Sequence, residues 1–172
     1  SLEAYGLVEL EDELLNLHTD YPRSTELTFE GSMIREDLGE ARTTALRNFC
    51  RHRDATLYMV LMAAFNIMLS KLSGQENIAV GSPIAGRSHI DFENHMGLFL
   101  HTLCLRNSVS PGESFSEFLK QVKQRAVHGY ENQDYQYDEL VKTVKLARDS
   151  GRNPLFDVML VVQNMEMPDV KM

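Results

Sequence analysis

The run from Leu57 to Leu72 constrains the fold most, because it is apolar on almost every side of the helix that it predicts. Thr56 precedes it as a suitable N-cap, and Gly74 follows it as the residue type that commonly ends a helix in the left-handed conformation. A helix that is apolar all round belongs inside a core. Polar residues interrupt the run, which is too short and too polar to span a bilayer (Asn66, Ser70 and Lys71).

Helical and strand patterns alternate on both sides of this run, which predicts an α/β fold. The residues between 97 and 106 are almost continuously apolar, as in a strand that is buried on both faces. The expected strands are Thr28–Ile34, Asn77–Ile84, Gly97–Arg106 and Leu155–Gln163. The other expected helices are Leu38–Arg53, a helix capped by Ser114 and ending near His128, and Tyr137–Val144, with a turn at Pro111-Gly112 and a polar loop from Arg148 to Pro154.

Composition excludes several function classes. The net charge is −8 over 172 residues, and the sequence shows no Lys/Arg cluster, which argues against binding to nucleic acid or to a membrane. Cys50 and Cys104 stand apart in a predicted helix and a predicted strand, as buried, reduced thiols do. Together with the absence of a signal sequence at the N-terminus, these features favour a cytoplasmic protein.

Four stretches, met in order, resemble motifs of the condensation domain of nonribosomal peptide synthetases. Leu15–Arg23 is similar to the family's LxLPTDxPRP connector, with His18 and Ser24 where the family has proline. Ala55–Arg87 resembles its long helix followed by VGxPxAGR, and Met96–Arg106 resembles VGxFVNTLxLR, with His101 in place of asparagine. Asn132–Asp138 and Arg148–Asp157 are similar to HQDxPFE and RDxSRNPLFD. Four ordered motifs make this resemblance specific.

The resemblance implies the C-terminal lobe of a two-lobed fold like that of chloramphenicol acetyltransferase, with a mixed sheet flanked by helices. Residues 1–27 would be the connector between lobes, and residues 28–172 the lobe itself. The family's catalytic HHxxxDG motif belongs to the N-terminal lobe, and this sequence has no adjacent histidine pair. We therefore expect the chain alone to be inactive.

The resemblance also implies a reaction and its partners. The family forms an amide between a donor acyl or peptidyl group and an acceptor aminoacyl group, each tethered to phosphopantetheine. The expected partners are the N-terminal lobe, the upstream and downstream peptidyl carrier proteins and an adjacent adenylation domain. No cofactor would bind this lobe directly, because phosphopantetheine stays on the carrier proteins.

The second and third motifs supply the candidate substrate-channel residues Gly81, Ser82, Pro83 and His101. The structural interpretation is that Gly81 and Pro83 shape the backbone and that His101 is a hydrogen-bonded strand residue. The functional interpretation, which follows from the resemblance, places the Ser82 hydroxyl and His101 beside the substrate. His89, His95 and His101 recur every six residues near Asp91 and Glu93, but without nearby cysteines we expect no metal site.

The last motif supplies the candidate hinge residues Arg148, Asp149, Arg152, Asn153 and Pro154. They are either a solvated charge cluster or the hinge of a latch, the strand from Leu155 to Gln163 that in the family crosses to the other lobe. An unpaired latch would expose a strand edge and favour self-association.

Two rival functions remain open. An epimerization domain shares the fold, but Phe156–Leu160 does not resemble the FNYLGQF strand that closes such domains. A non-catalytic module that docks carrier proteins is less attractive, because carrier proteins are acidic like this chain.

Overall fold

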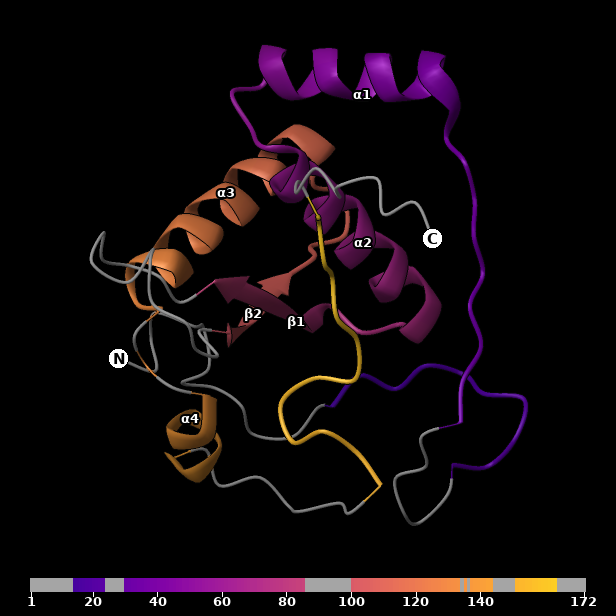
Figure 1. The fold of residues 1–172 in the computed structure, drawn as a ribbon, viewed down its shortest axis with the longest axis vertical. Helices are drawn as coiled ribbons and strands as arrows, with labels where there is room; N and C mark the ends of the chain where they lie inside the picture. The colour runs from indigo at the N-terminus through magenta and orange to yellow at the C-terminus, as the bar shows by residue number, and fades with distance from the viewer. Residues whose placement is uncertain are drawn as a thin grey trace, which may run out of the picture.

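Helices and strands alternate along the described part of the chain, which confirms the α/β class (Figure 1). The computed structural model describes residues 14–23, 30–85, 100–133, 135, 137–143 and 151–163. Its elements are α1 (Gly39–His52), α2 (Leu57–Ser73), β1 (Asn77–Ala85), β2 (Leu100–Ser108), α3 (Phe115–Glu131) and α4 (Tyr137–Thr143).

The described strands form a two-stranded antiparallel sheet, and one isolated parallel bridge is all that the described residues show of the mixed sheet that was expected. β1 and β2 form an antiparallel ladder whose register runs from Asn77 opposite Ser108 to Ala85 opposite Leu100. On the other edge of β1, Gly81 forms a parallel bridge with Met159. The Gly81 N–H donates to the Val158 carbonyl at 2.9 Å, and its carbonyl accepts from the Leu160 N–H at 2.9 Å.

The predicted strand from Leu155 to Gln163 is therefore too long, because only this bridge forms. Its first residues serve a turn instead. The side-chain oxygen of Asn153 accepts from the N–H groups of Leu155 at 3.1 Å and Phe156 at 3.4 Å. These two donors point into the turn, and ladder pairing begins only at Val158.

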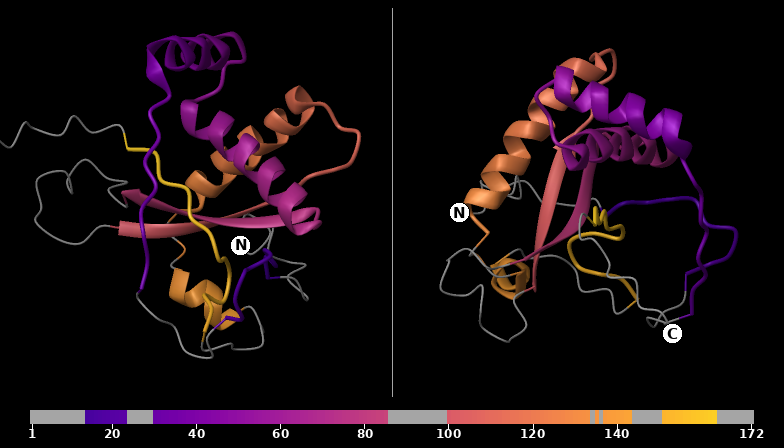
Figure 2. Two further views of the ribbon diagram at one scale, coloured as in Figure 1. Left: turned by 90° about the vertical axis from the view of Figure 1, so that its right-hand side faces the viewer. Right: turned by 45° about the horizontal axis from the view of Figure 1, so that its top comes forward.

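Both faces of the sheet are covered (Figure 2). Helices α2 and α3 lie on one face, and α4 with the start of the 151–163 segment lies on the other. Three consecutive residues of β2, Leu103, Cys104 and Leu105, are consequently all buried, as the apolar run predicts. Close packing of α3 depends on Gly129, where a Cβ would lie 2.7 Å from Cδ2 of Leu105.

Helix α2 begins and ends as its sequence indicates. The Thr56 hydroxyl accepts from the Met59 N–H at 3.2 Å, and Gly74 has φ of 74°. Burial is less complete than expected, because Met68 and Leu72 are 47% and 57% exposed on the side turned away from the sheet. Among the described residues, no single helix is long and apolar enough to cross a membrane, and only α1 and α2 taken together, bent by 103°, would meet those criteria.

Helix α1 lies across one end of the molecule (Figure 1). Only part of its apolar face is buried. Cys50 near its C-terminal end is buried, whereas Ala41 and Ala45 are exposed. The strand expected at Thr28–Ile34 is absent from residues 30–34, where Met33 and Ile34 are 75% and 89% exposed, and residues 28–29 lie outside the described part. No strand among the described residues pairs with residues 30–34, so the apolar alternation in this segment does not lead to a strand.

Candidate functional site

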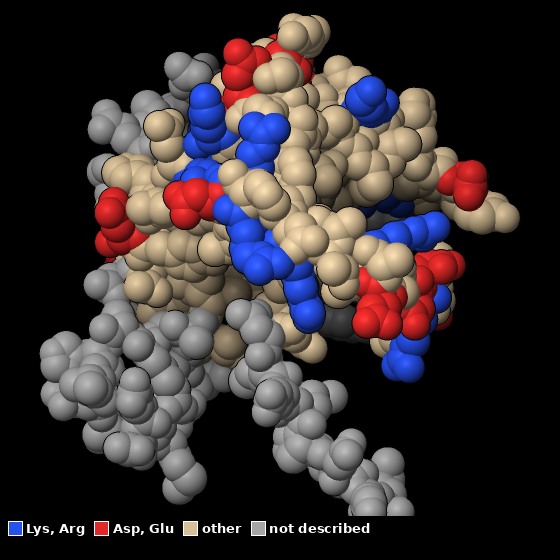
Figure 3. Space-filling view, turned by 90° about the horizontal axis from the view of Figure 1, so that it is seen from above, with Lys and Arg blue, Asp and Glu red and all other residues tan. Residues whose placement is uncertain are grey.

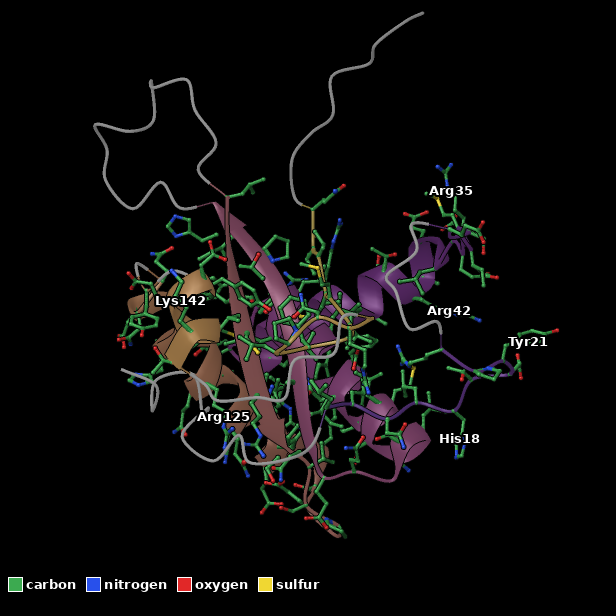
Figure 4. All side chains as sticks on the ribbon, turned by 90° about the horizontal axis from the view of Figure 1, so that it is seen from below. His18, Tyr21, Arg35, Arg42, Arg125 and Lys142 are labelled. Carbon is green, nitrogen blue, oxygen red and sulfur yellow. The ribbon has the colours of Figure 1, made fainter. Side chains whose placement is uncertain are left out.

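Within the stretch that the sequence predicts to be a connector, residues 14–16 are fastened to the rest of the structure by their backbone. Leu15 is buried in the core. Gln75, which follows the C-cap of α2, accepts a hydrogen bond from the Asn16 N–H at 2.7 Å and donates one to the Leu14 carbonyl at 3.3 Å. Farther along, Tyr21 points away from the molecule and is 82% exposed (Figure 4). Residues 14–16 are therefore a fixed point of this stretch.

Arg152 joins the connector to the C-terminal segment. Its Nη2 donates to the Leu15 carbonyl at 2.5 Å, and its Nε donates to Oδ1 of Asp157 at 3.0 Å. Asp157 also lies 3.9 Å from a guanidinium nitrogen of Arg23. The side chains of Arg152 and Asp157 are 15% and 7% exposed, so this is a mostly buried pair and not a solvated charge cluster.

Asn153 is the centre of the turn that follows. Besides the N–H groups of Leu155 and Phe156, its side-chain oxygen accepts from the hydroxyl of Tyr137 on α4. Burial is the main cause that raises the pKa of Tyr137 to about 12, and the bond to Asn153 opposes that shift. Pro154 is partly buried in the same turn, while Arg148 and Asp149 lie outside the described residues. A hinge role for these residues stays a prediction.

Gly81 is where the C-terminal segment meets the sheet. A Cβ on this residue would lie 2.5 Å from Cε2 of the Phe156 ring, so the ring occupies the space that a side chain would need. The ring also packs against Tyr137, with centroids 5.7 Å apart. Cys104, opposite Gly81 in the ladder, is buried, and burial raises the pKa of its thiol to about 12. These contacts give Gly81 the close-approach role of the structural interpretation.

The Ser82 hydroxyl is 2% exposed and donates to the Leu160 carbonyl at 3.2 Å. It lies near Tyr58, where burial raises the pKa of the phenol and the Ser82 side chain opposes the shift. Pro83 is half-buried beside it and pairs in register with Thr102. The chain itself thus provides a partner for the Ser82 hydroxyl, and contact of this hydroxyl with a substrate stays a prediction.

His101 is half-buried at the start of β2, and its Nδ1 lies 3.1 Å from the Gln133 carbonyl. A carbonyl only accepts, so Nδ1 carries the proton in this bond and Nε2 is left for another partner. The bond brings the stretch Met96–Arg106 against the stretch Asn132–Asp138, at the turn after α3. In the ladder, Ser82 pairs with Leu103 and Ile84 pairs with His101. Because side chains alternate along a strand, Ser82 and His101 point to the same face, two positions apart.

The described residues hold no group of three or more His, Cys, Asp or Glu side chains that could bind a metal ion. His89, Asp91, Glu93 and His95 lie outside them. Sequence reasoning assigned no role to Gln75, Tyr137 or Asp157, which the structure places at this junction. Asp157 stood within a quoted motif, so its pairing with Arg152 could have been considered.

The described stretches that resemble condensation-domain motifs lie around one sheet, which is the arrangement expected of that class of protein. Comparisons with known proteins identify the same class. The model of the condensation domain family matches residues 3–172, and this chain belongs to that family. It is 48% identical over 166 residues to Gramicidin S synthase 2 of Brevibacillus brevis, covering 95% of this chain and 4% of the relative. It is 45% identical over 164 residues to Tyrocidine synthase 3 of Brevibacillus parabrevis, covering 94% and 2%. The chain thus spans a small part of these relatives.

Solved structures agree on the fold. A four-domain nonribosomal peptide synthetase bound to AMP and glycine superposes with a TM-score of 0.82 at 25% identity, over 85% of this chain and 11% of that one. The X-domain from teicoplanin biosynthesis has a TM-score of 0.79 at 17% identity, over 86% and 33%. These neighbours confirm the expected fold.

Proposed function

We propose that this chain is the C-terminal lobe of a condensation domain that forms an amide between a donor acyl or peptidyl group and an acceptor aminoacyl group. The observation that carries the proposal is the junction at Arg152. Arg152 hydrogen-bonds Leu15 in the expected connector and Asp157 in the segment that resembles the latch. In the family, the connector and the latch are the two segments that lead to the other lobe. The identity to synthetases over nearly the whole chain supports the same conclusion.

The reaction transfers an acyl group from sulfur to nitrogen. The acceptor amine attacks the thioester carbonyl of the donor, a C–N bond forms and the C–S bond breaks. The proton lost by nitrogen ends on the released phosphopantetheine thiol. Proton transfer and charge stabilisation of this kind need a positioned histidine or an equivalent group. The adjacent histidine pair of the family is not in this sequence, so we assign this lobe the holding of the substrates.

The holding site that we propose is the end of the ladder where β2 begins at the half-buried His101, because helices cover the middle of the face that carries Ser82 (Figure 2). Nε2 of His101 is the atom left to meet a substrate carbonyl or amine, because Nδ1 is held by Gln133. Peptidyl carrier proteins on both sides and an adenylation domain would supply the tethered groups. Phosphopantetheine would remain on the carriers.

The test uses the whole domain, in which this chain follows an N-terminal lobe with HHxxxDG. Loaded donor and acceptor carrier proteins are mixed with it, and the amide product is measured by mass spectrometry. We expect product from the whole domain and none above background from the chain alone. Product from the chain alone would contradict the assignment of catalysis to the other lobe. A stereochemically inverted donor without amide would instead identify an epimerization domain.

A further inference from the structure

Helix α1 ends in a cluster of arginines that the net charge of −8 conceals. Arg47 and Arg51 stand one helical turn apart, Arg53 follows at the C-cap, and all three are exposed. Figure 3 shows Lys and Arg side chains gathered in the middle of the face seen from above. We call Arg47, Arg51 and Arg53 the basic end of α1.

Local contacts hold these side chains in place. A guanidinium nitrogen of Arg51 donates to the side-chain oxygen of Asn48, and the Arg53 guanidinium lies 5.6 Å from the centre of the Phe49 ring. The neighbouring carboxylate of Asp54 is engaged by Lys123 at 3.3 Å. Because that lysine balances Asp54, the basic end of α1 keeps its positive charge.

A cavity of about 590 Å³ opens beside Arg47. It lies between α1, the first turn of α2, the end of α3 and the C-terminal segment, and its lining is about equally polar and apolar, with Leu57, Met59 and Val162 among its apolar residues and Thr56 and Gln163 among its polar ones. The rings of Tyr58 and Tyr130, which also line it, are 6.3 Å apart. Leu57 is 37% exposed, so the apolar lining is reachable from the surface.

We propose that the basic end of α1 and this cavity form a docking surface for an acidic helical segment of another protein. Two guanidinium groups one turn apart match carboxylates at the same spacing on a partner helix, and Arg–carboxylate pairs are directional as well as strong. An apolar side chain of the partner fills the cavity, as anchors do at protein interfaces. A nucleic acid would use the arginines but not the apolar part of the cavity. This inference does not depend on the proposed amide-forming function.

The probe is a fluorescein-labelled helical peptide with two glutamates one turn apart and a leucine on the same face. Its binding to the 172-residue chain is followed by fluorescence anisotropy at low and at high salt. We expect saturable binding that weakens with salt, and at least about a tenfold weaker affinity for Arg47→Glu combined with Arg51→Glu. A peptide with alanine in place of leucine should bind at least about threefold more weakly.

Arg35 supplies the matched control, since it is exposed, points outward (Figure 4) and does not line the cavity. Arg35→Glu reverses one charge, as Arg47→Glu does. We expect the affinity of this variant for the peptide to stay within about twofold of that of the original chain. Circular dichroism and thermal melts verify that each variant is folded. No saturable binding, equal losses for Arg35→Glu and Arg47→Glu, or indifference to the leucine would each overturn the proposal. A DNA duplex that binds more tightly than the peptide would overturn it in favour of nucleic acid.

Discussion

Nε of Arg152 donates to Oδ1 of Asp157 across 3.0 Å, and the same guanidinium holds the Leu15 carbonyl 137 positions earlier in the chain. Removing Arg152 deprives the buried Asp157 carboxylate of its near partner and leaves it with the more distant, partly exposed Arg23 at 3.9 Å. We therefore expect Arg152→Met to lower the free energy of unfolding by about 3 kcal/mol, measured by urea denaturation.

The double variant Arg152→Met with Asp157→Leu should lose less than the single variant, because it leaves no buried charge without its near partner. Lys142→Ala, an exposed change on α4, is the control and should stay within about 0.5 kcal/mol of the original. A loss below about 1 kcal/mol for Arg152→Met would show that the pair does not fasten the connector.

Gly81→Ala tests the contact with Phe156. The new Cβ would lie 2.5 Å from the ring, which is buried and cannot withdraw freely. We expect a loss of about 1–3 kcal/mol in the free energy of unfolding, typical of overpacking. Gly31→Ala, where nothing lies within 4 Å of the added Cβ, should be nearly neutral. Part of the loss should be recovered by adding Phe156→Leu, and equal melting temperatures for the two glycine variants would contradict the assigned role.

Alkaline pH should weaken the fold through Tyr137. Its pKa is raised from 10.0 to about 12 mainly by burial, so the unfolded chain gives up this proton first. The contribution of the neutral Tyr137 phenol to the free energy of unfolding is complete below pH 10 and is lost as the pH rises towards 12. The difference in free energy of unfolding between the original chain and Tyr137→Phe should therefore shrink over that range.

Ser82→Ala separates structure from catalysis. The hydroxyl donates to the Leu160 carbonyl in a buried setting, so its loss should lower the free energy of unfolding by about 1 kcal/mol. In the whole domain, amide formation per folded molecule should fall by less than about tenfold, as for a residue that positions rather than reacts. Unchanged stability with a drop of about a hundredfold in turnover would instead place the hydroxyl on the substrate.

His101→Asn restores the residue usual in the family and retains a side-chain donor. We expect turnover of the whole domain within about threefold of the original, whereas His101→Phe removes the donor to Gln133 and should lower the melting temperature. The pair of variants is compared by thermal melts and by product formation. A large loss of turnover in His101→Asn alone would assign the imidazole a role that an amide cannot fill.

Local signals in the sequence predicted the elements well where chemistry acts within a few residues. The Thr56 cap, the left-handed Gly74 and the Ser114 cap all stand where the sequence indicates. β1 and the described part of β2 also match. Such signals depend on neighbouring atoms in the chain and need no knowledge of the tertiary fold.

Long-range contacts were the part that pattern could not supply. Apolar alternation predicted strands at Thr28–Ile34 and Leu155–Gln163, yet a strand also needs a partner, and the N–H groups of Leu155 and Phe156 are taken by Asn153. The bond between Arg152 and Leu15 spans 137 positions and has no periodicity to reveal it. Arg47, Arg51 and Arg53 lie within seven consecutive residues, but only the helix places Arg47 and Arg51 one turn apart beside the cavity.

Gln75 and Arg152 grip the connector through the carbonyls of Leu14 and Leu15, not through the side chains of those residues. Every amino acid has the same main-chain carbonyl, so these hydrogen bonds do not depend on which residues occupy positions 14 and 15. Only the burial of the Leu15 side chain restricts the residue type. Substitutions at residues 14 and 15 should therefore leave both hydrogen bonds available. A recombination breakpoint just before residue 14 would keep both hydrogen bonds and the native Leu15. A breakpoint between residues 16 and 75 would also keep both bonds, so the fit of the foreign segment would depend on an apolar residue at position 15.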